Sequence, residues 1–314
     1  MKYSFILGLL VNFLVVCPCL AAVSWKTVRC DEVSFNGKSM HEMWDNALLM
    51  AQTANTRINS ITSGLVLPRT SGGRVADNAH FMFGINVSWG VKLGSAAKST
   101  LSDVSAVYSN VEDLLGRDAG YLLCNGLGLQ YGEIGAYATG VWYYAIPGTD
   151  DAIILRYTAG SGMINQVNPC EDGKTAGQTF RGQYLSSTVS GDQYTEILGI
   201  LICTNQITPS RYKATLDLGF TVSGNKGVSD DYKSIAGTIL HEMVHATNVD
   251  KYQDQFNVAF PDGYAAYGAS RAMYLATHDQ QAALVNPDNY RIFAEMSMSP
   301  KTAWQAPNNG LAIS

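Results

Sequence analysis

The sequence predicts an α+β fold, because helical patterning occupies its two ends and strand-like patterning its middle. Up to about Gly116, apolar residues recur at helical spacing. Between about Gly120 and Gly227, glycine becomes frequent and short β-branched and aromatic runs appear. From Ser229 onward the helical period returns. Helices and strands that are segregated along the chain in this way are typical of α+β domains.

Two helices are predicted in the first zone. The segment from Met40 to Ile61 has one apolar stripe, made of Met43, Ala47, Leu48, Ala51, Ala54 and Ile58. The segment from Leu101 to Leu115 repeats the pattern with Val104, Val107, Tyr108, Val111 and Leu115. Between them, residues 81–87 are predicted to form a short strand or a turn.

The middle zone contains three apolar runs of strand length, at residues 140–146, 152–157 and 197–203. The segment from Pro147 to Asp151, which separates the first two runs, is Pro-Gly-Thr-Asp-Asp and has the composition of a turn. These two strands are therefore predicted to form a hairpin.

The third zone is predicted to open with a helix capped by Ser229 or Asp230. Its apolar face contains Ile235, Ala236, Ile239, Leu240 and Met243. The most informative motif of the chain lies within this predicted helix.

Composition excludes several classes of protein. The chain has 314 residues, of which 46% are apolar, and this is enough to build a core and argues against disorder. The net charge is −5 and no basic run occurs, which argues against nucleic-acid partners and anionic membrane surfaces. No Pro-rich, Ser-rich or charged linker divides the chain, so we expect one domain over residues 22–314.

The N-terminus has the pattern of a secretory signal peptide. Lys2 precedes an almost unbroken apolar run from Phe5 to Val16, and the small residues Cys19 and Ala21 follow at the −3 and −1 positions of a cleavage site. The run is shorter than the about 20 residues that a membrane span needs. We therefore expect residues 1–21 to be a signal peptide and the mature protein to be secreted and extracellular.

Four cysteines remain after this cleavage, at positions 30, 124, 170 and 203. An even number of cysteines in an exported chain predicts two disulfides, with three possible pairings.

The third-zone helix contains His241-Glu-Met-Val-His245. Residues four apart lie on one helix face, so both imidazoles can reach a single Zn²⁺ ion. Glu242 is placed to act as the general base for a water at that ion. The motif therefore predicts one zinc per chain and metal-assisted hydrolysis.

A third ligand must come from beyond the helix. A third histidine at the short spacing of the metzincin pattern is absent, since Lys251 stands there. His278 is the only later histidine, and we expect it at an exposed helix position. The remaining candidates are Asp250, Asp254 and Asp262.

The region 195–297 resembles the aspzincins, the fungal secreted deuterolysin and peptidyl-Lys metalloendopeptidase group. Their signature is HExxH, then an Asp ligand, then Tyr-Gly. The segments that carry the resemblance are the strand ending at Cys203, His241–His245, Tyr252-Gln-Asp254, Ala266-Tyr-Gly268, Asn286-Pro-Asp-Asn-Tyr290 and Phe293-Ala294. The chain departs from the compact family motif, because Tyr267 stands thirteen positions after Asp254.

This resemblance implies a zincin-like metalloprotease fold with a glycine-rich β middle zone. It favours Asp254 as the third zinc ligand, with Asp262 and then Asp250 as alternatives. It assigns Tyr267 as a hydrogen-bond donor to the developing oxyanion. Together with chain order, it favours the disulfides Cys30–Cys124 and Cys170–Cys203.

The resulting hypothesis is a secreted, monomeric zinc metalloendopeptidase that acts on peptide or protein substrates, with no nucleic-acid or membrane partner in its mature form. The stretched spacing between Asp254 and Tyr267 motivates an alternative from another class. In that alternative, the protein is a secreted zinc-binding or host-interaction protein on the same fold, without proteolytic activity.

Overall fold

A computed structural model describes residues 25–63, 66, 70–86, 92–114, 120–158, 162–163, 168–171, 175–208, 212–222, 233–257, 260, 265–302 and 304. The predicted signal peptide and Asp262 lie outside the described residues.

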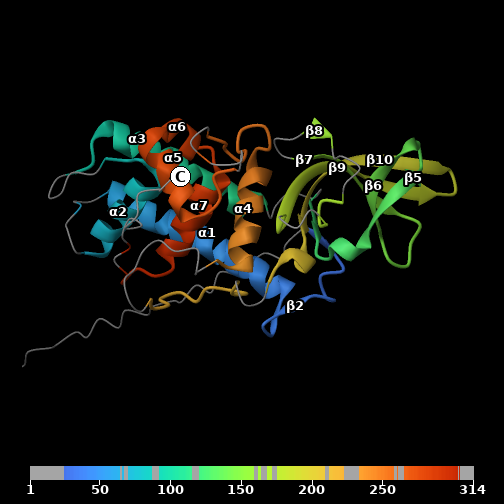
Figure 1. Ribbon diagram of the computed structural model, residues 1–314, viewed down its shortest axis with the longest axis horizontal. Coiled ribbons are helices and arrows are strands. Elements are labelled where there is room, and N and C mark those ends of the chain that lie inside the picture. The colour runs from blue at the N-terminus through green and yellow to red at the C-terminus, as the bar shows by residue number, and fades with distance from the viewer. Residues whose placement is uncertain are drawn as a thin grey trace, which may run out of the picture.

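Helices gather on one side of the molecule and a sheet extends from the other (Figure 1). The helices are α1 Met40–Thr62, α2 Ser71–Phe83, α3 Ser95–Asp113, α4 Ile235–Thr247, α5 Ala269–His278, α6 Gln280–Ala283 and α7 Pro287–Ser297. The strands are β1 Lys26–Val28, β2 Ser34–Phe35, β3 Lys38–Ser39, β4 Gly120–Leu123, β5 Leu129–Ile134, β6 Tyr137–Ala145, β7 Ala152–Thr158, β8 Gly162–Met163, β9 Gly177–Thr188 and β10 Gly191–Ile202. The predicted α+β class is confirmed.

Helix α1 forms where its apolar stripe predicted. Ser39 and Glu42 start it with a capping box, in which the Ser39 hydroxyl accepts from the Glu42 N–H and the Glu42 carboxylate accepts from the Ser39 N–H. All six residues of the predicted stripe are buried in the core that α1 shares with α3, α4 and α7. Helix α3 likewise covers most of the second predicted helix.

The prediction of a strand or turn at residues 81–87 is wrong for its first part, because α2 continues to Phe83. Thr70 caps this helix by accepting from the N–H of Gly73 at 3.1 Å. Gly84 then ends it in the left-handed conformation, with φ of 62°. Adjacent glycines at positions 72 and 73 lower helix propensity and conceal the helix in the sequence.

Eight strands form one mixed sheet in the order β1-β4-β10-β9-β7-β6-β5, with β8 paired to β7. The pairs β1–β4 and β4–β10 are parallel, and the other pairs are antiparallel. The predicted hairpin is confirmed, since β6 pairs with β7 from Trp142 opposite Leu155 to Ala145 opposite Ala152. The long strand β9 was not predicted, and it pairs with β10 over its whole length.

Both predicted disulfides are present. Cys30–Cys124 joins the segment after β1 to the end of β4, and Cys170–Cys203 joins a loop to the end of β10. Within the described residues, no helix has the length and apolarity that crossing a bilayer would require.

Helix α4 stands at the boundary between the two sides of the molecule, where it packs on α1, α3 and α7 and also on β9 and β10 (Figure 1). Its N-cap is Ser234, whose hydroxyl accepts from the N–H of Gly237 at 2.8 Å. The predicted caps, Ser229 and Asp230, are therefore wrong by four or five residues. Because it touches both halves of the fold, α4 brings groups from each to its own side chains.

Candidate metal centre

The two motif histidines point to one place from successive turns of α4. His241 and His245 are both buried, and their Nε2 atoms lie 3.2 Å apart. When the nitrogens of two buried histidines face each other, their lone pairs repel unless a cation or a shared proton lies between them. The helix thus presents two adjacent nitrogen donors in one direction, as the motif predicted.

The chain returns to these histidines immediately after α4. A turn at Asn248, which accepts from the N–H of Tyr252 at 2.9 Å, reverses the direction of the backbone. The Tyr252 carbonyl then meets the Nδ1 of His245 at 2.7 Å. Asp254 follows two residues later, with its Oδ1 at 3.3 Å from the Nε2 of His241 and 3.5 Å from that of His245.

The donor atoms of His241, His245 and Asp254 all lie within 4.8 Å of one another. Asp254 Oδ1 is buried and has no hydrogen-bond partner among the described residues. A buried carboxylate oxygen without a partner is costly unless a cation neutralises it. Two imidazole nitrogens and one carboxylate oxygen form a donor set that Zn²⁺ prefers, so the residues present fit this ion.

The other two candidate carboxylates stand differently. The Asp250 carboxylate is 76% exposed and forms an ion pair with Arg181 at 2.7 Å, away from the histidines. Asp262 lies outside the described residues. Of the two candidates that the structure describes, Asp254 is the one that lies beside the histidine pair.

Charges at the site are strongly coupled. Burial opposes protonation of His241, but the neighbouring carboxylates of Asp254, Asp288 and Glu242 outweigh it and raise the pKa of His241 to about 10. Burial also opposes ionisation of Asp254, yet the two histidines hold the pKa of this carboxyl well below its usual range. The pocket therefore favours a carboxylate together with positive charge, whether that charge is a proton or a metal ion.

Glu242 follows His241 but faces the sheet. It is 4% exposed, and its Oε2 accepts a hydrogen bond from the Thr179 hydroxyl of β9 at 2.8 Å. Gly177, the first residue of β9, leaves room for this side chain, since a Cβ there would lie 2.9 Å from the Glu242 Cγ. The β strand thus fixes the orientation of the carboxylate next to the histidine pair.

Tyr267 reaches the site from the segment before α5. Its hydroxyl donates to Asp254 Oδ2 at 2.5 Å, and its ring lies 5.8 Å from the ring of His241. Burial of the hydroxyl and the neighbouring Asp254 carboxylate raise the pKa of Tyr267, so it remains a protonated donor. Its partner in the structure is the carboxylate of Asp254, and the oxyanion role stays a prediction.

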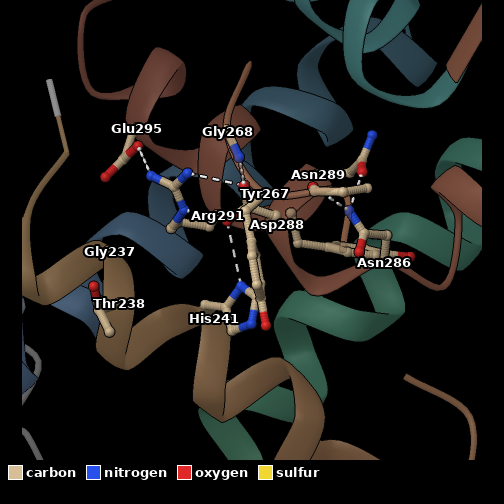
Figure 2. A network of polar contacts seen from close by, with 12 residues as sticks. Gly237, Thr238, His241, Tyr267, Gly268, Asn286, Asp288, Asn289, Arg291 and Glu295 are labelled. Atoms are coloured by element: carbon tan, nitrogen blue, oxygen red, sulfur yellow. Dashed lines mark hydrogen bonds and ion pairs between the residues drawn. The ribbon is translucent and has the colours of Figure 1, made fainter. Parts of the chain in front are cut away.

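Residues from α7 complete the surroundings and were not predicted as site residues (Figure 2). Asp288 places its Oδ1 3.3 Å from the Nδ1 of His241, and Arg291 and Glu295 extend from it along the same helix face. Their spacing of three and four residues was the available signal, because side chains so spaced are neighbours on a helix. His278 is exposed on α5, as expected.

No family model and no curated protein matches the chain. Among solved structures, the chain is similar to a zinc peptidase from Grifola frondosa, with 16% sequence identity and a TM-score of 0.33. That similarity covers 82% of this chain and 96% of the other. At this level of similarity the activity of the neighbour does not transfer to the chain.

Proposed function

We propose that the protein is a secreted zinc-dependent endopeptidase of the aspzincin type. The observation that carries this proposal is the meeting of the His241, His245 and Asp254 donor atoms, with Glu242 beside them. The buried Asp254 Oδ1 has no hydrogen-bond partner among the described residues. In this proposal those three residues hold one Zn²⁺, and the mature chain is a single domain over residues 22–314. The two disulfides support an extracellular location, because such bonds persist in oxidising compartments.

When bound, Zn²⁺ acidifies a water molecule and polarises the carbonyl of a peptide bond. Glu242 accepts the proton of the attacking water and delivers it to the leaving amine. The hydrogen bond from Thr179 keeps one oxygen of Glu242 occupied, which leaves the other oxygen for the proton. Tyr267, a protonated phenol, shifts its one hydrogen bond from Asp254 to the carbonyl oxygen as negative charge develops there.

The test is Glu242→Gln, which keeps the shape of the side chain and removes the base. Casein digestion should fall by about 10²- to 10⁴-fold, the usual contribution of a general base. Zinc content should stay at the wild-type value of one per chain. Glu133→Gln, on the exposed carboxylate of β5, is the matched control and should digest casein normally.

A Glu242→Gln variant that digests casein at the wild-type rate would overturn the mechanism. A wild-type protein that binds one zinc but shows no chelator-sensitive cleavage would instead favour the zinc-binding or host-interaction alternative. Absence of stoichiometric zinc from the wild type would contradict both.

A further inference from the structure

Three charged side chains form a buried chain of ion pairs along one face of α7 (Figure 2). Arg291 holds Asp288 with two contacts, from Nε to Oδ1 at 2.6 Å and from Nη2 to Oδ2 at 3.0 Å. Its Nη1 donates to Glu295 Oε2 at 2.7 Å. All three residues are buried, so Arg291 joins two buried carboxylates.

Both ends of this chain of ion pairs contact α4 or its N-cap. At one end, Asp288 Oδ1 lies 3.3 Å from the Nδ1 of His241. At the other end, Glu295 Oε1 accepts from the N–H and the hydroxyl of Ser234, the N-cap of α4, at 3.3 and 3.2 Å. The chain of ion pairs therefore spans from the N-cap of the motif helix to its first histidine.

The Asp288 carboxylate has little freedom to rotate. Besides Arg291, it accepts from the backbone N–H of Gly268 at 2.5 Å. Its Oδ1 is thereby fixed beside the Nδ1 of His241, which favours the tautomer with the proton on Nδ1. The Nε2 lone pair of His241 then faces His245 and Asp254.

The two histidines are thus oriented by different means. His245 is held by a backbone carbonyl, that of Tyr252, which folding fixes once the turn is made. His241 is held by the side chain of Asp288, whose buried charge is neutralised by Arg291. Apolar residues could hold α4 and α7 together equally well. Packing alone therefore does not explain why a series of buried ion pairs ends at a histidine nitrogen.

We propose that Arg291 and Glu295 are positioning residues for metal binding, which clamp Asp288 and so orient His241 toward the ion. This inference rests on the proposed function only in that the protein must bind zinc, and it does not require proteolysis. Groups behind a metal-binding histidine set its orientation and basicity, and their loss typically weakens metal affinity by about 10- to 100-fold.

Arg291→Lys is the sharpest variant, because it keeps the charge and removes the planar fork that contacts both carboxylates. Asn46→Ala is its matched control. Asn46 joins α1 to Leu216 by two hydrogen bonds, at 2.9 and 2.8 Å, and belongs to neither α4 nor α7. Its replacement lowers the stability of the fold without touching the clamp.

The experiment uses the mature protein, stripped with a chelator. Zinc affinity is measured by competition with a chromophoric chelator, the free energy of unfolding of the metal-free protein by urea denaturation, and ligand geometry by the absorption bands of bound Co²⁺. Arg291→Lys should weaken zinc binding by about 10- to 100-fold and change the Co²⁺ spectrum. Asn46→Ala should lower stability and leave both metal readouts at wild-type values.

Glu295→Gln is a milder second variant, since it keeps the acceptor for Ser234 and weakens the contact with Arg291. It should lower zinc affinity by less than Arg291→Lys does. The double variant should lose no more affinity than Arg291→Lys alone, because both substitutions act on the same series of ion pairs.

If wild-type protein binds zinc and Arg291→Lys binds it equally tightly, the clamp is wrong and the proposed function stands. If Asn46→Ala weakens zinc binding as much, general destabilisation explains the effect and the clamp is wrong. A wild type that binds no zinc overturns both.

Discussion

Two aspartates four residues apart have opposite surroundings in this protein. Asp254 turns inward to the histidine pair, with a buried oxygen that has no hydrogen-bond partner in the described part of the chain. Asp250 turns outward and pairs with Arg181. Asp250 lies within the turn that the Tyr252 N–H closes onto the Asn248 carbonyl, whereas Asp254 follows that turn.

Asparagine substitutions at these two positions should therefore differ in effect. Asp254→Asn replaces a charged donor by a neutral amide, so zinc affinity should fall by more than the about 10- to 100-fold expected for losing an outer partner. Asp250→Asn should leave zinc affinity unchanged, because an exposed ion pair contributes little. Equilibrium dialysis with zinc checks both variants.

If Asp254→Asn retained wild-type affinity, Asp254 would not be the third ligand and Asp262 would be the next candidate. Spacing alone left this choice open. The sequence places three aspartates within reach of His245, and only the tertiary path of residues 248–254 distinguishes two of them.

At the scale of elements, α7 and α4 are in close contact, because a residue of α7 reaches the first turn of α4 at a glycine. Gly237 lies in the first turn of α4 under Glu295, and a Cβ there would lie 2.2 Å from Glu295 Oε1. A glycine within a helix ordinarily costs stability. Here the missing side chain provides the space in which a carboxylate contacts the helix N-terminus.

Two glycine-to-alanine substitutions in first helical turns should have opposite signs. Gly237→Ala should lower the free energy of unfolding by about 1–3 kcal/mol, because the new methyl group displaces Glu295. Gly72→Ala, in α2, should raise it by about 0.4–1 kcal/mol, because alanine restricts the unfolded chain and its Cβ would meet Ile61 and Thr70 at ordinary distances of 3.6 and 3.8 Å. Urea denaturation of both variants measures the difference, and equal effects would contradict the close contact of α7.

Elements with strong local signals were predictable. The apolar stripe of α1 and the Pro-Gly-Thr-Asp-Asp turn between β6 and β7 each specify structure within a few residues. Helix α2 and strand β9 were missed because their local sequences are ambiguous. Strand β9 begins Gly-Gln-Thr-Phe-Arg-Gly, and it is specified by pairing with β10 rather than by its own propensity.

At the scale of the whole molecule, one buried carboxyl should give stability a recognisable pH dependence. Burial raises the pKa of Glu295 to about 7, with Arg291 opposing the rise and Asp288 adding to it. An acid whose pKa is higher in the folded state binds more protons when folded, so stability falls as pH rises between the unfolded and folded pKa values. The ordinary value for this group is 4.5.

The free energy of unfolding of the metal-free protein should therefore lose about 3 kcal/mol through Glu295 as pH rises from about 4.5 to about 7. Glu295→Gln lacks this titration, so its stability should fall less steeply over the same range. Urea denaturation in chelator, at a series of pH values, measures both slopes. Equal slopes for wild type and variant would show that Glu295 titrates normally.

The parts of the site divide in the same way as the fold. His241, Glu242 and His245 belong to one helix, so the motif alone proposes them as site residues. Thr179, Asp288, Arg291 and Glu295 come from other elements, and no local pattern relates them to α4. Their contribution depends on the packing of α4 between α7 and β9, which periodicity does not report.

Because α4 lies between the helices and the sheet, the two halves of the molecule support different residues of the proposed site. His241 is supported from the helical half through Asp288, whereas Glu242 is supported from the sheet through Thr179. Retaining the ion and moving the proton are thus assigned to different halves of the molecule. A substitution in the sheet can slow turnover in a protein that stays fully loaded, and one in α7 can release the metal while the base keeps its place.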